Sequence, residues 1–365
     1  MKIKQRIHDL CFSITFTKNL YCTISYCKRK ICYWFLLVRP ILKYKRENKK
    51  PVFLVFTPEH ANLGDHAIAF SEKRMLDKMG IKYYEITGRN LTILNQFGFL
   101  QILDKALILV NGGGNLGTLW PEIEYMNRRI IMENSNACIY ILPNSIYYDN
   151  DETGREEFEK SKEIYNSHKR LFLYAREKIS YNIMKDAYNH VKLVPDMVLF
   201  LDEVQPIGKR NGCLICLRND VEQTLSLSDK ERAVSITRDI FQGNIKITDT
   251  VLDYFVTLDQ RKAELNKKFK EFRTADLVIT DRLHGMIFAA ITATNCIVLN
   301  SKSPKLKGCY EWISDLEYIE FVDDVNSIEE VYMKMRHKEN KFNNSMILKY
   351  LSTLEKDIYS AYEMI

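Results

Sequence analysis

The chain has little that would carry it into or across a membrane. Its apolar stretch at residues 31–38 (ICYWFLLV) has eight residues, whereas a membrane-spanning helix needs about 20. No small-residue cleavage site of a secretory signal follows this stretch, and Lys43, Lys45 and Arg46 come directly after it. We therefore expect a protein that neither spans the membrane nor carries a secretory signal.

The cysteines form no regular framework. Their number, nine, is odd, and four of them lie in the first 32 residues. This usage favours a reducing cytoplasm over a disulfide scaffold. Cys213 and Cys216 form a C-x-x-C pair, but they lie in an apolar strand pattern, where positions three apart point to opposite faces. No second pair completes a zinc site.

Charge is distributed unevenly. The net charge is +6, yet residues 1–50 hold 13 Lys or Arg against Asp9 and Glu47, a net of +11. The remaining residues, with 40 basic and 45 acidic side chains, have a net charge of −5. A basic tail thus precedes a mildly acidic body, and nothing here predicts binding of nucleic acid.

This basic tail also has an amphipathic pattern. If residues 20–38 are helical, Lys18 and Arg29 lie opposite one apolar stripe, formed by Leu20, Ile24, Cys27, Ile31, Trp34, Phe35 and Val38. Such a helix fits an interface rich in anionic lipid. The alternative is an ordinary amphipathic helix that packs on the body of the protein.

The body of the chain predicts two α/β domains. With 365 residues, 46% of them hydrophobic, two domains are favoured over one. Residues 51–205 alternate strand patterns with helix patterns, the strands at 52–57, 82–87, 106–110, 138–142 and 171–175, and the helices at 66–79, 120–134, 153–168 and 178–188. Alternation of this kind predicts a mainly parallel sheet covered by helices on both faces, as in a Rossmann-like domain.

A second alternation covers residues 206–340. Its strands are expected at 213–217, 277–280, 296–299 and 319–322, with a helix at 260–274. Pro206, Gly208 and Gly212 give residues 202–212 the composition of a linker, so the boundary is placed there. Residues 341–365 carry a helical apolar stripe and are expected to pack against the fold.

Two loops after strands are candidate binding elements. Residues 111–117 (NGGGNLG) follow a strand and precede a helix, so their glycines can bring backbone N–H groups close to a ligand. They match neither the Walker loop nor the G-x-G-x-x-G fingerprint, and a tight turn without function is the alternative. Residues 62–65 (NLGD) occupy the equivalent place after the first strand, where Asp65 would either bind a ligand or act as a helix N-cap.

The strongest signal is the turn at residues 280–287 (TDRLHGMI). Residues 277–280 read as a buried strand, and residues 285–293 read as an apolar helix. Arg282 and His284 therefore lie at the carboxyl end of a strand and near the start of a helix, where open α/β sheets bind ligands and where the helix dipole favours anions. We expect an acidic substrate to bind at this turn.

Taken together, these segments carry a specific resemblance. The chain resembles the polysaccharide pyruvyl transferase family over about residues 51–320 and in the family's motif order, with NLGDHAI at 62–68, GGGNLG at 112–117, LWP at 119–121, LPNSI at 142–146, YARE at 174–177, PD at 195–196 and TDRLHG at 280–285. Many relatives have an aspartate where this chain has Thr118, which leaves the role of that carboxylate in question here.

The resemblance implies a fold and a reaction. The fold is two Rossmann-like domains that face a cleft, similar to the GT-B glycosyltransferases. In the reaction, phosphoenolpyruvate donates its three-carbon unit to two hydroxyls of one sugar, giving a pyruvate ketal and free phosphate. Fold alone would not establish this activity, because the same architecture hosts many sugar-nucleotide enzymes.

Arginines suit such a donor. Phosphate and carboxylate groups accept bidentate hydrogen bonds from guanidinium groups. Arg282 resembles the family's donor-binding arginine, with Leu283, His284 and Gly285 beside it, and Arg218 resembles a second. The alternatives are an ion pair of Arg218 with Asp220, and a structural pair of Arg282 with Asp281 or another carboxylate.

Ketal formation also needs a proton at the methylene carbon of the donor. A histidine titrates near neutral pH and can recover its proton from the attacking sugar hydroxyl. We hypothesise that His284 is this acid, while Arg282 neutralises and positions the donor. The alternative is a histidine that only caps the helix or bonds within the core.

The sugar is expected on the N-terminal domain. Candidate acceptor-side residues are Asn62, Gly64, Asp65, Asn111, Gly113, Gly114, Asn115 and Arg176. Arg176 also allows an ordinary ion pair. No metal site and no cofactor are predicted, because His60 and His66 have no third ligand at a recognisable spacing.

Three functions remain in competition. The leading hypothesis is a cytoplasmic pyruvyl transferase acting on a surface polysaccharide or its lipid-linked precursor, held at the inner face of the cell membrane by residues 1–50. The second is a glycosyltransferase of the same fold that uses a sugar nucleotide. The third is a non-catalytic, membrane-associated carbohydrate-binding protein. The sequence leaves the acceptor sugar and the oligomeric state open.

Overall fold

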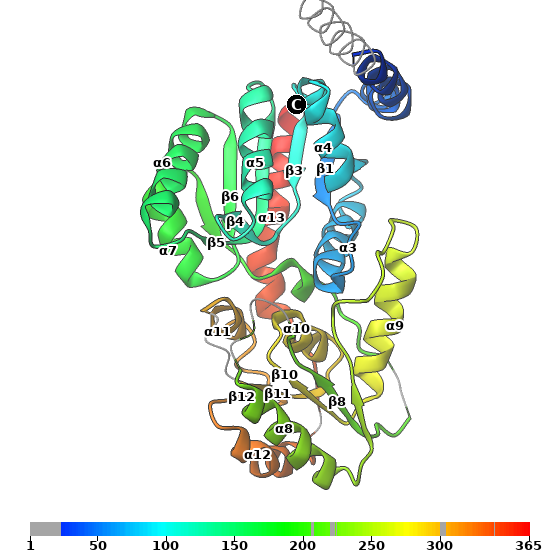
Figure 1. Ribbon diagram of the computed structural model, residues 1–365, viewed down its shortest axis with the longest axis vertical. Coiled ribbons are helices and arrows are strands. Elements are labelled where there is room, and N and C mark those ends of the chain that lie inside the picture. The colour runs from blue at the N-terminus through cyan, green and yellow to red at the C-terminus, as the bar shows by residue number, and fades with distance from the viewer. Residues whose placement is uncertain (1–22, 206–207, 220–222, 224, 300–303, 339) are drawn as a thin grey trace, which may run out of the picture.

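A computed structural model describes residues 23–205, 208–219, 223, 225–299, 304–338 and 340–365. It consists of two α/β domains stacked end to end, with helices on both faces of each sheet (Figure 1). The predicted fold class is confirmed.

The N-terminal domain is built on a seven-stranded sheet in which every paired strand is parallel. Its strands are β1 (Val52–Thr57), β2 (Tyr84–Thr87), β3 (Leu107–Val110), β4 (Gly113–Gly117), β5 (Cys138–Tyr147), β6 (Leu171–Ala175) and β7 (Val191–Leu193). The surrounding helices are α3 (Leu63–Lys78), α4 (Gly88–Gln96), α5 (Pro121–Glu133), α6 (Glu152–Ser167), α7 (Lys178–Ala187) and the short 3₁₀ segments η2 (Leu100–Leu103) and η3 (Met197–Phe200).

The C-terminal domain has a five-stranded parallel sheet. Its strands are β8 (Cys213–Cys216), β9 (Ile245–Ile247), β10 (Leu277–Thr280), β11 (Asn295–Leu299) and β12 (Ile319–Val322). Its helices are α8 (Leu227–Ile240), α9 (Arg261–Thr274), α10 (Leu283–Ile291), α11 (Pro304–Tyr310) and α12 (Ile328–Met335), with the 3₁₀ turn η4 (Val325–Ser327).

Both sheets have the same strand order. The order is β2-β1-β3-β5-β6-β7 in the first domain and β12-β11-β10-β8-β9 in the second. Numbered within each domain, with β4 left aside, the first sheet reads 2-1-3-4-5-6 and the second, taken from β9, reads 2-1-3-4-5. This is the doubly wound order, in which ligands bind where the first and third strands diverge. The carboxyl ends of β1, β3, β8 and β10 are therefore the places where a site is expected.

The central strands are apolar because both of their faces are covered. Leu54 packs in the core shared by the two domains, while its neighbour Phe53 packs in the core on the other face of the first sheet. Cys216 and Cys213 likewise belong to separate cores on the two faces of the second sheet, as predicted for positions three apart in a strand.

The C-terminal helix α13 (Ser345–Met364) returns to the N-terminal domain (Figure 1). Its predicted apolar stripe is buried in the shared core, and Asp357 accepts hydrogen bonds from the Tyr174 hydroxyl and, at 2.6 Å, from Lys192 Nζ. This helix therefore ties the last residues of the chain to the first domain.

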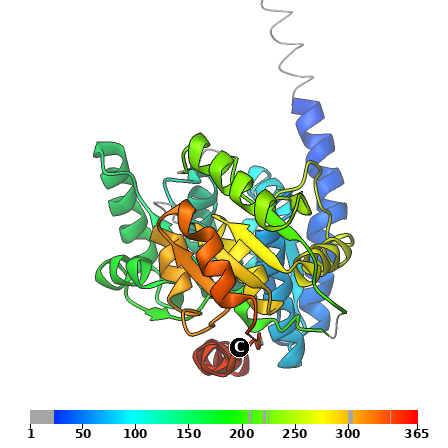
Figure 2. The same ribbon diagram turned by 90° about the horizontal axis from the view of Figure 1, so that it is seen from below.

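The described part of the basic tail is one continuous helix from residue 23 to residue 47, with a π-helical segment η1 (Trp34–Val38) followed by α2 (Arg39–Glu47). Val38 and Ile41 are buried in the N-terminal core, and the Tyr44 hydroxyl donates to the carbonyl of Val52 or Lys82, each 3.0 Å away. Seen from below, this helix stands at the edge of the molecule (Figure 2). Among the described residues, every helix is too short or too polar to cross a membrane.

The glycine loop is the main local correction. Residues 111–117 were expected to run as a loop into a helix, but Gly113–Gly117 forms strand β4, which pairs in parallel with β5. The pairing arises because β5 continues past residue 142, the predicted strand end, to Tyr147, so Asn144 and Ile146 offer backbone partners to Gly113 and Leu116. Helix α4 was not predicted.

Candidate active site

The predicted site residues gather where the two domains meet. The loop after β1 and the loop after β9 are joined by backbone hydrogen bonds: the Leu63 N–H donates to the Thr250 carbonyl at 2.8 Å, and the Leu252 N–H donates to the Ala61 carbonyl at 2.9 Å. An isolated antiparallel bridge links Asn62 to Val251. The expected acceptor loop is therefore in direct contact with a loop of the second domain that was not predicted as part of the site.

His284 is presented by the tight turn between β10 and α10. The Thr280 hydroxyl donates to the Cys216 carbonyl at 2.7 Å and accepts the Arg282 N–H at 3.0 Å, which ties the turn to β8. Gly285 packs directly on the Thr280 side chain, so any side chain at this position would collide with it. His284 follows the N-cap residue Arg282 and lies in the first turn of α10, as predicted.

The His284 ring reaches across to the N-terminal domain. A Cβ atom added to Gly64 would lie 2.6 Å from His284 Cγ and closer still to Nδ1, so the ring occupies the space that the missing side chain leaves. On its other side, His284 Nε2 lies 3.8 Å from Asp196 Oδ2. His284 is thus enclosed by groups of the first domain although it belongs to the second.

Asp196 joins His284 to Arg176. The Arg176 Nη1 donates to Asp196 Oδ2 at 2.9 Å, and its Nε donates to the Ser145 hydroxyl at 2.8 Å. Burial lowers the pKa of His284 below its ordinary value, while the negative charge of Asp196 acts in the opposite direction. Arg176 is buried in this ion pair, which was the alternative considered for it.

The two predicted donor-binding arginines contact carboxylates, Arg282 through its guanidinium and Arg218 through its backbone N–H. Arg282 contacts Asp249 on two atoms, Nε to Oδ1 at 2.5 Å and Nη2 to Oδ2 at 2.7 Å. The Arg218 N–H donates to Asp281 Oδ1 at 2.7 Å. Burial raises the pKa of Asp281, and the Arg218 N–H partly offsets this effect. The partner proposed for Arg218, Asp220, lies outside the described residues.

Polar groups also line the edge of β4. The Asn115 N–H donates to Asn144 Oδ1 at 3.0 Å, and Lys305 Nζ of α11 donates to the Gly114 carbonyl at 3.1 Å. A Cβ atom on Gly114 would lie 2.5 Å from Arg176 Nη2. Gly114 therefore allows Arg176 of one domain and Lys305 of the other to approach the same backbone.

The loop that precedes α3 is ordered by its own side chains. Asn62 is the N-cap of α3, because its Oδ1 accepts the Gly64 N–H at 3.0 Å, so Asp65 is not the cap that was considered. The Asn62 Nδ2 donates to Asp65 Oδ2 at 2.9 Å, and His60 Nε2 lies 3.5 Å from the same oxygen.

Some predicted residues lie nearer to the scaffold than to the junction. The Asn111 Nδ2 donates to the adjacent Gly112 carbonyl at 2.8 Å, and Leu283 packs against the shared core. Gly113 has a φ of +150°, a backbone conformation that favours glycine. The Thr118 hydroxyl accepts the Asp149 N–H at 2.9 Å, so Thr118 orders the turn after β5.

Sequence reasoning missed four side chains at or near the junction: Asp196, Asp249, Lys305 and Glu72. Glu72 is fully buried; its Oε1 accepts the Gly112 N–H at 2.8 Å, and burial raises its pKa well above the ordinary value. Only Asp196 had a signal, because it belongs to the Pro195-Asp196 motif of the family resemblance. Asp249 and Lys305 stand in segments without a motif.

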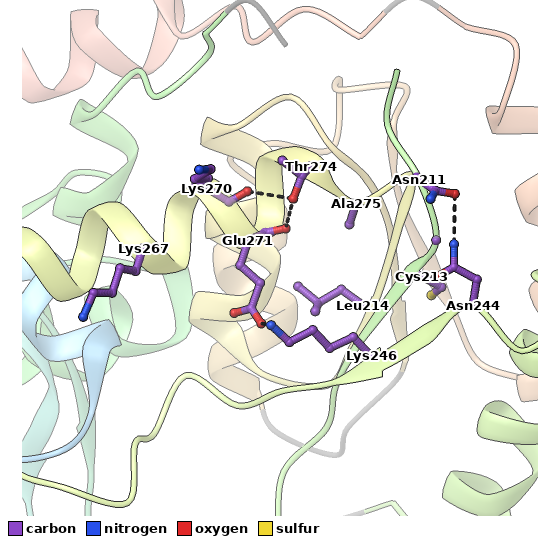
Figure 3. A pocket seen from close by; sticks show the side chains of 11 residues that line it. Asn211, Cys213, Leu214, Asn244, Lys246, Lys267, Lys270, Glu271, Thr274 and Ala275 are labelled. Atoms are coloured by element: carbon purple, nitrogen blue, oxygen red, sulfur yellow. Dashed lines mark hydrogen bonds and ion pairs between the residues drawn. The ribbon is translucent and has the colours of Figure 1, made fainter. Parts of the chain in front are cut away.

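A separate pocket of about 430 Å³ lies away from this junction (Figure 3). It opens at the amino-terminal ends of β8 and β9, and therefore at the opposite end of the strands from His284. Glu271 on its wall already pairs with Lys246 and Lys268, each at 2.6 Å. Within the described residues, no three His, Cys, Asp or Glu side chains group in a way that would hold a metal ion.

Comparison with known proteins identifies the family. The family model described as polysaccharide pyruvyl transferase matches residues 62–303, which contain every residue discussed at the junction except His60, Ala61 and Lys305. The chain belongs to the polysaccharide pyruvyl transferase family. The predicted enzyme class is thereby confirmed.

Relatives in this family are similar over most of their length. General stress protein 30 of Bacillus subtilis (strain 168) is 33% identical over 299 residues, covering 78% of this chain and 84% of that protein. Pyruvyl transferase 1 of Schizosaccharomyces pombe is 26% identical over 290 residues, covering 72% and 70%.

Solved structures share the GT-B-like fold. A functionally uncharacterised protein of Klebsiella pneumoniae aligns with a TM-score of 0.51 at 16% identity, covering 78% of this chain and 97% of that one. The MnaA–UDP co-structure from S. aureus aligns with a TM-score of 0.50 at 10% identity, covering 86% and 97%. At these identities the likeness concerns the fold alone.

Proposed function

We propose that the protein transfers the pyruvyl group of phosphoenolpyruvate to two hydroxyls of one sugar in a surface polysaccharide or its lipid-linked precursor. The product is a pyruvate ketal, and phosphate is released. Membership in the pyruvyl transferase family supports the transferred group. The observation that carries the finer proposal is the position of His284, which lies between the family's arginine turn and the loop after β1.

The donor is an anion with a phosphate and a carboxylate, and the site offers the buried Arg282 and the half-buried Arg218. Arg282 and Arg218 lie at the carboxyl ends of β10 and β8, the strands at the switch point of the second sheet. Asp249 holds the Arg282 guanidinium in a two-point contact, which orients it before any donor binds. We assign donor binding to these two arginines, with Leu283, His284 and Gly285 forming the turn.

The chemistry requires one proton transfer to carbon. His284 protonates the methylene carbon, which becomes the methyl group, and the central carbon is then attacked by a sugar hydroxyl. A second hydroxyl of the same sugar displaces phosphate from this carbon. One hydroxyl proton returns to His284 and the other leaves with phosphate, so the reaction consumes no cofactor.

We place the sugar on the first domain, opposite Arg282. The amide and carboxylate groups of Asn62, Asp65 and Asn115 are suited to bind sugar hydroxyls. Asp65 and Asn62 are hydrogen-bonded to each other. Gly64 lies between them, and because it has no side chain the His284 ring can approach its backbone.

The direct test mixes the full chain with phosphoenolpyruvate and candidate sugar acceptors and measures released phosphate and product mass. We expect phosphate release that depends on the acceptor, and His284→Ala to lower the rate by about 10² to 10⁴. Asp357→Asn, on α13 and outside the proposed site, is the control. Binding of a nucleoside diphosphate without turnover of phosphoenolpyruvate would overturn the proposal in favour of a glycosyltransferase.

We further propose that the helix at residues 23–47 lies on the anionic inner face of the cell membrane. The helix packs on the N-terminal domain through one face, with the rings of Tyr26 and Tyr33 centred 5.0 and 5.4 Å from that of Phe97. Most of the apolar stripe predicted for lipid lies on another face, but its last residue, Val38, is buried in the N-terminal core, which corrects that part of the prediction. The stripe residues Ile31 and Phe35 remain 60% and 54% exposed.

The charge of this helix suits the same partner. Lys28, Arg29, Arg39 and Arg46 are exposed, and Glu47, near Lys43 at 3.7 Å, is the one acidic residue in the described part of the helix. Exposed apolar side chains beside exposed cations are typical of helices that lie in an interface with anionic lipid. The leading residue of the stripe, Leu20, lies outside the described residues.

Vesicle flotation tests this surface in the full chain. Truncating the tail would remove Val38 and Ile41 from the core, so we use the double substitution Ile31→Ser with Phe35→Ser instead. The unmodified chain should float with vesicles that contain phosphatidylglycerol, more weakly at high salt, and the double variant should not. Leu227→Ser, at a residue 68% exposed on the other domain, is the control. Equal flotation of all three proteins would refute membrane contact.

A further inference from the structure

We propose that Asp196 is a positioning residue for His284: it holds the Nε2 atom of the ring, so that the proton of the reaction is exchanged at Nδ1. The inference rests on the proposed function only for the use of that proton. The placement of the ring between Asp196 and Gly64 is independent of it.

The Asp196 carboxylate is fixed from both of its oxygens. Oδ1 accepts the Val198 N–H at 2.9 Å, and Oδ2 accepts Arg176 Nη1 at 2.9 Å. The Asp196 residue is completely buried, so water does not compete for these oxygens. A carboxylate held in this way acts as a rigid acceptor whose remaining neighbour is His284.

The His284 Nε2 atom is buried and makes no hydrogen bond to another described residue. Its separation of 3.8 Å from Asp196 Oδ2 is an ion-pair distance, and a shift of about 1 Å would bring it within hydrogen-bond range. Contacts of catalytic groups are often long in the free enzyme and shorten in the substrate complex. Protonation of Nε2 satisfies the buried nitrogen and the carboxylate together.

The opposite nitrogen faces the loop on which the acceptor is expected. Nδ1 is the atom closest to the position that a side chain on Gly64 would take. When one ring nitrogen is held by a carboxylate, the other is left with its lone pair directed at the substrate, as in other histidine sites. Nδ1 is therefore the nitrogen that gives and recovers the proton.

Four charged groups from four segments act on His284. Asp196 and Asp65 favour the charged ring, whereas Arg176 and Arg218 disfavour it. Asp196, Asp65 and Arg176 belong to the first domain, and only Arg218 shares the domain of His284. The protonation of His284 thus depends on the contact between the domains, and Asp196 makes the nearest of the favourable contributions.

Nuclear magnetic resonance tests the assignment without any substrate. Two-bond ¹H–¹⁵N spectra of histidine-labelled protein report the tautomer of each ring, and His284→Ala identifies its signals among the seven histidines. We expect neutral His284 to carry its proton on Nε2, and Asp196→Asn to lower the His284 pKa. A neutral ring protonated on Nδ1, or an unchanged pKa in the variant, would overturn the proposal.

Kinetics provide the second readout. In Asp196→Asn we expect kcat to fall by more than about tenfold, with a smaller change in KM for phosphoenolpyruvate. In the pH profile of kcat, we expect the decline at high pH to begin at a lower pH than in the unmodified enzyme. Should the single variant fail to fold because Arg176 is left unpaired, Asp196→Asn with Arg176→Gln removes both charges. Glu124→Gln, at another buried carboxylate of the first domain, should leave the pH limb unchanged.

The two experiments separate the two proposals. If phosphoenolpyruvate is not the donor, the kinetic measurement has no signal, and the spectra alone decide the role of Asp196. If Asp196 does not position His284, turnover of phosphoenolpyruvate is observed, but the pH limb of Asp196→Asn coincides with that of the unmodified enzyme.

Discussion

Gly64→Ala adds a single methyl group at the contact between the two domains. Gly64 is the second residue of α3 and its φ is not positive, so alanine suits its backbone. The added Cβ would lie 2.6 Å from His284 Cγ and 3.0 Å from His284 Cβ. Since carbon atoms pack at about 3.5–4.0 Å, the ring must move by about 1 Å or the domains must separate.

The expected stability change is small and the expected activity change is large. Alanine in place of a helical glycine stabilises the helix by about 0.5–1 kcal/mol, whereas overpacking costs about 1–3 kcal/mol, so the net loss is at most about 2.5 kcal/mol. A displacement of about 1 Å in a catalytic group lowers the rate by about 10²-fold. We therefore expect a folded protein with about a hundredth of the turnover.

The assay is phosphate release from phosphoenolpyruvate in the presence of acceptor, with thermal unfolding measured on the same samples. Gly88→Ala is the matched control, because Gly88 is the first residue of α4 and its added Cβ would meet only Phe56 ring atoms at 3.4 Å. A Gly64→Ala enzyme that folds and turns over at the rate of the unmodified enzyme would refute the placement of His284 against this loop as part of catalysis.

Two further predictions concern buried charges beside the junction. Burial raises the pKa of Glu72, so its contribution to stability is complete below the unfolded pKa of about 4.3 and is lost as the pH rises through the folded pKa. In urea titrations, the free energy of unfolding of Glu72→Gln should therefore decline less steeply above about pH 5 than that of the unmodified protein. The same dependence on pH in both proteins would contradict this. Arg261, 2% exposed, donates to Glu85 at 2.5 Å and to the Pro58 carbonyl at 3.1 Å. Arg261→Met should cost about 3–5 kcal/mol by denaturant unfolding, because Glu85 then keeps, among the described residues, Lys73 alone as an ion-pair partner. A loss below about 1 kcal/mol would exclude a structural role for Arg261.

The sequence by itself determined the layered architecture. The strands at 52–57 and 277–280 are short apolar runs bounded by polar turns, and such runs are stable only when both faces of a sheet are covered. The same local logic placed Arg282 and His284 at a strand end, because Thr280 closes the strand and the apolar run that follows has helical length. These features depend on residues close together in the chain.

The glycine segment shows where local reasoning fails. Gly113–Gly117 has little preference for a strand, and it became β4 only because β5 extends to Tyr147 and offers its backbone edge. The tail shows the same limit. Its periodicity predicted a helix and an apolar stripe, but only the tertiary structure decided that Tyr26 and Tyr33, on another face, contact the body.

The set of residues that form the site likewise depends on the tertiary structure. Asp196 is 88 positions from His284 in sequence, and Asp249 meets Arg282 from a loop with no motif. Charge pairing of this kind follows from the spatial meeting of two sheets at their carboxyl ends, which no periodicity encodes. The sequence supplied the histidine and the arginines, whereas the fold supplied the carboxylates that orient them and the glycine that lets the histidine reach the other domain.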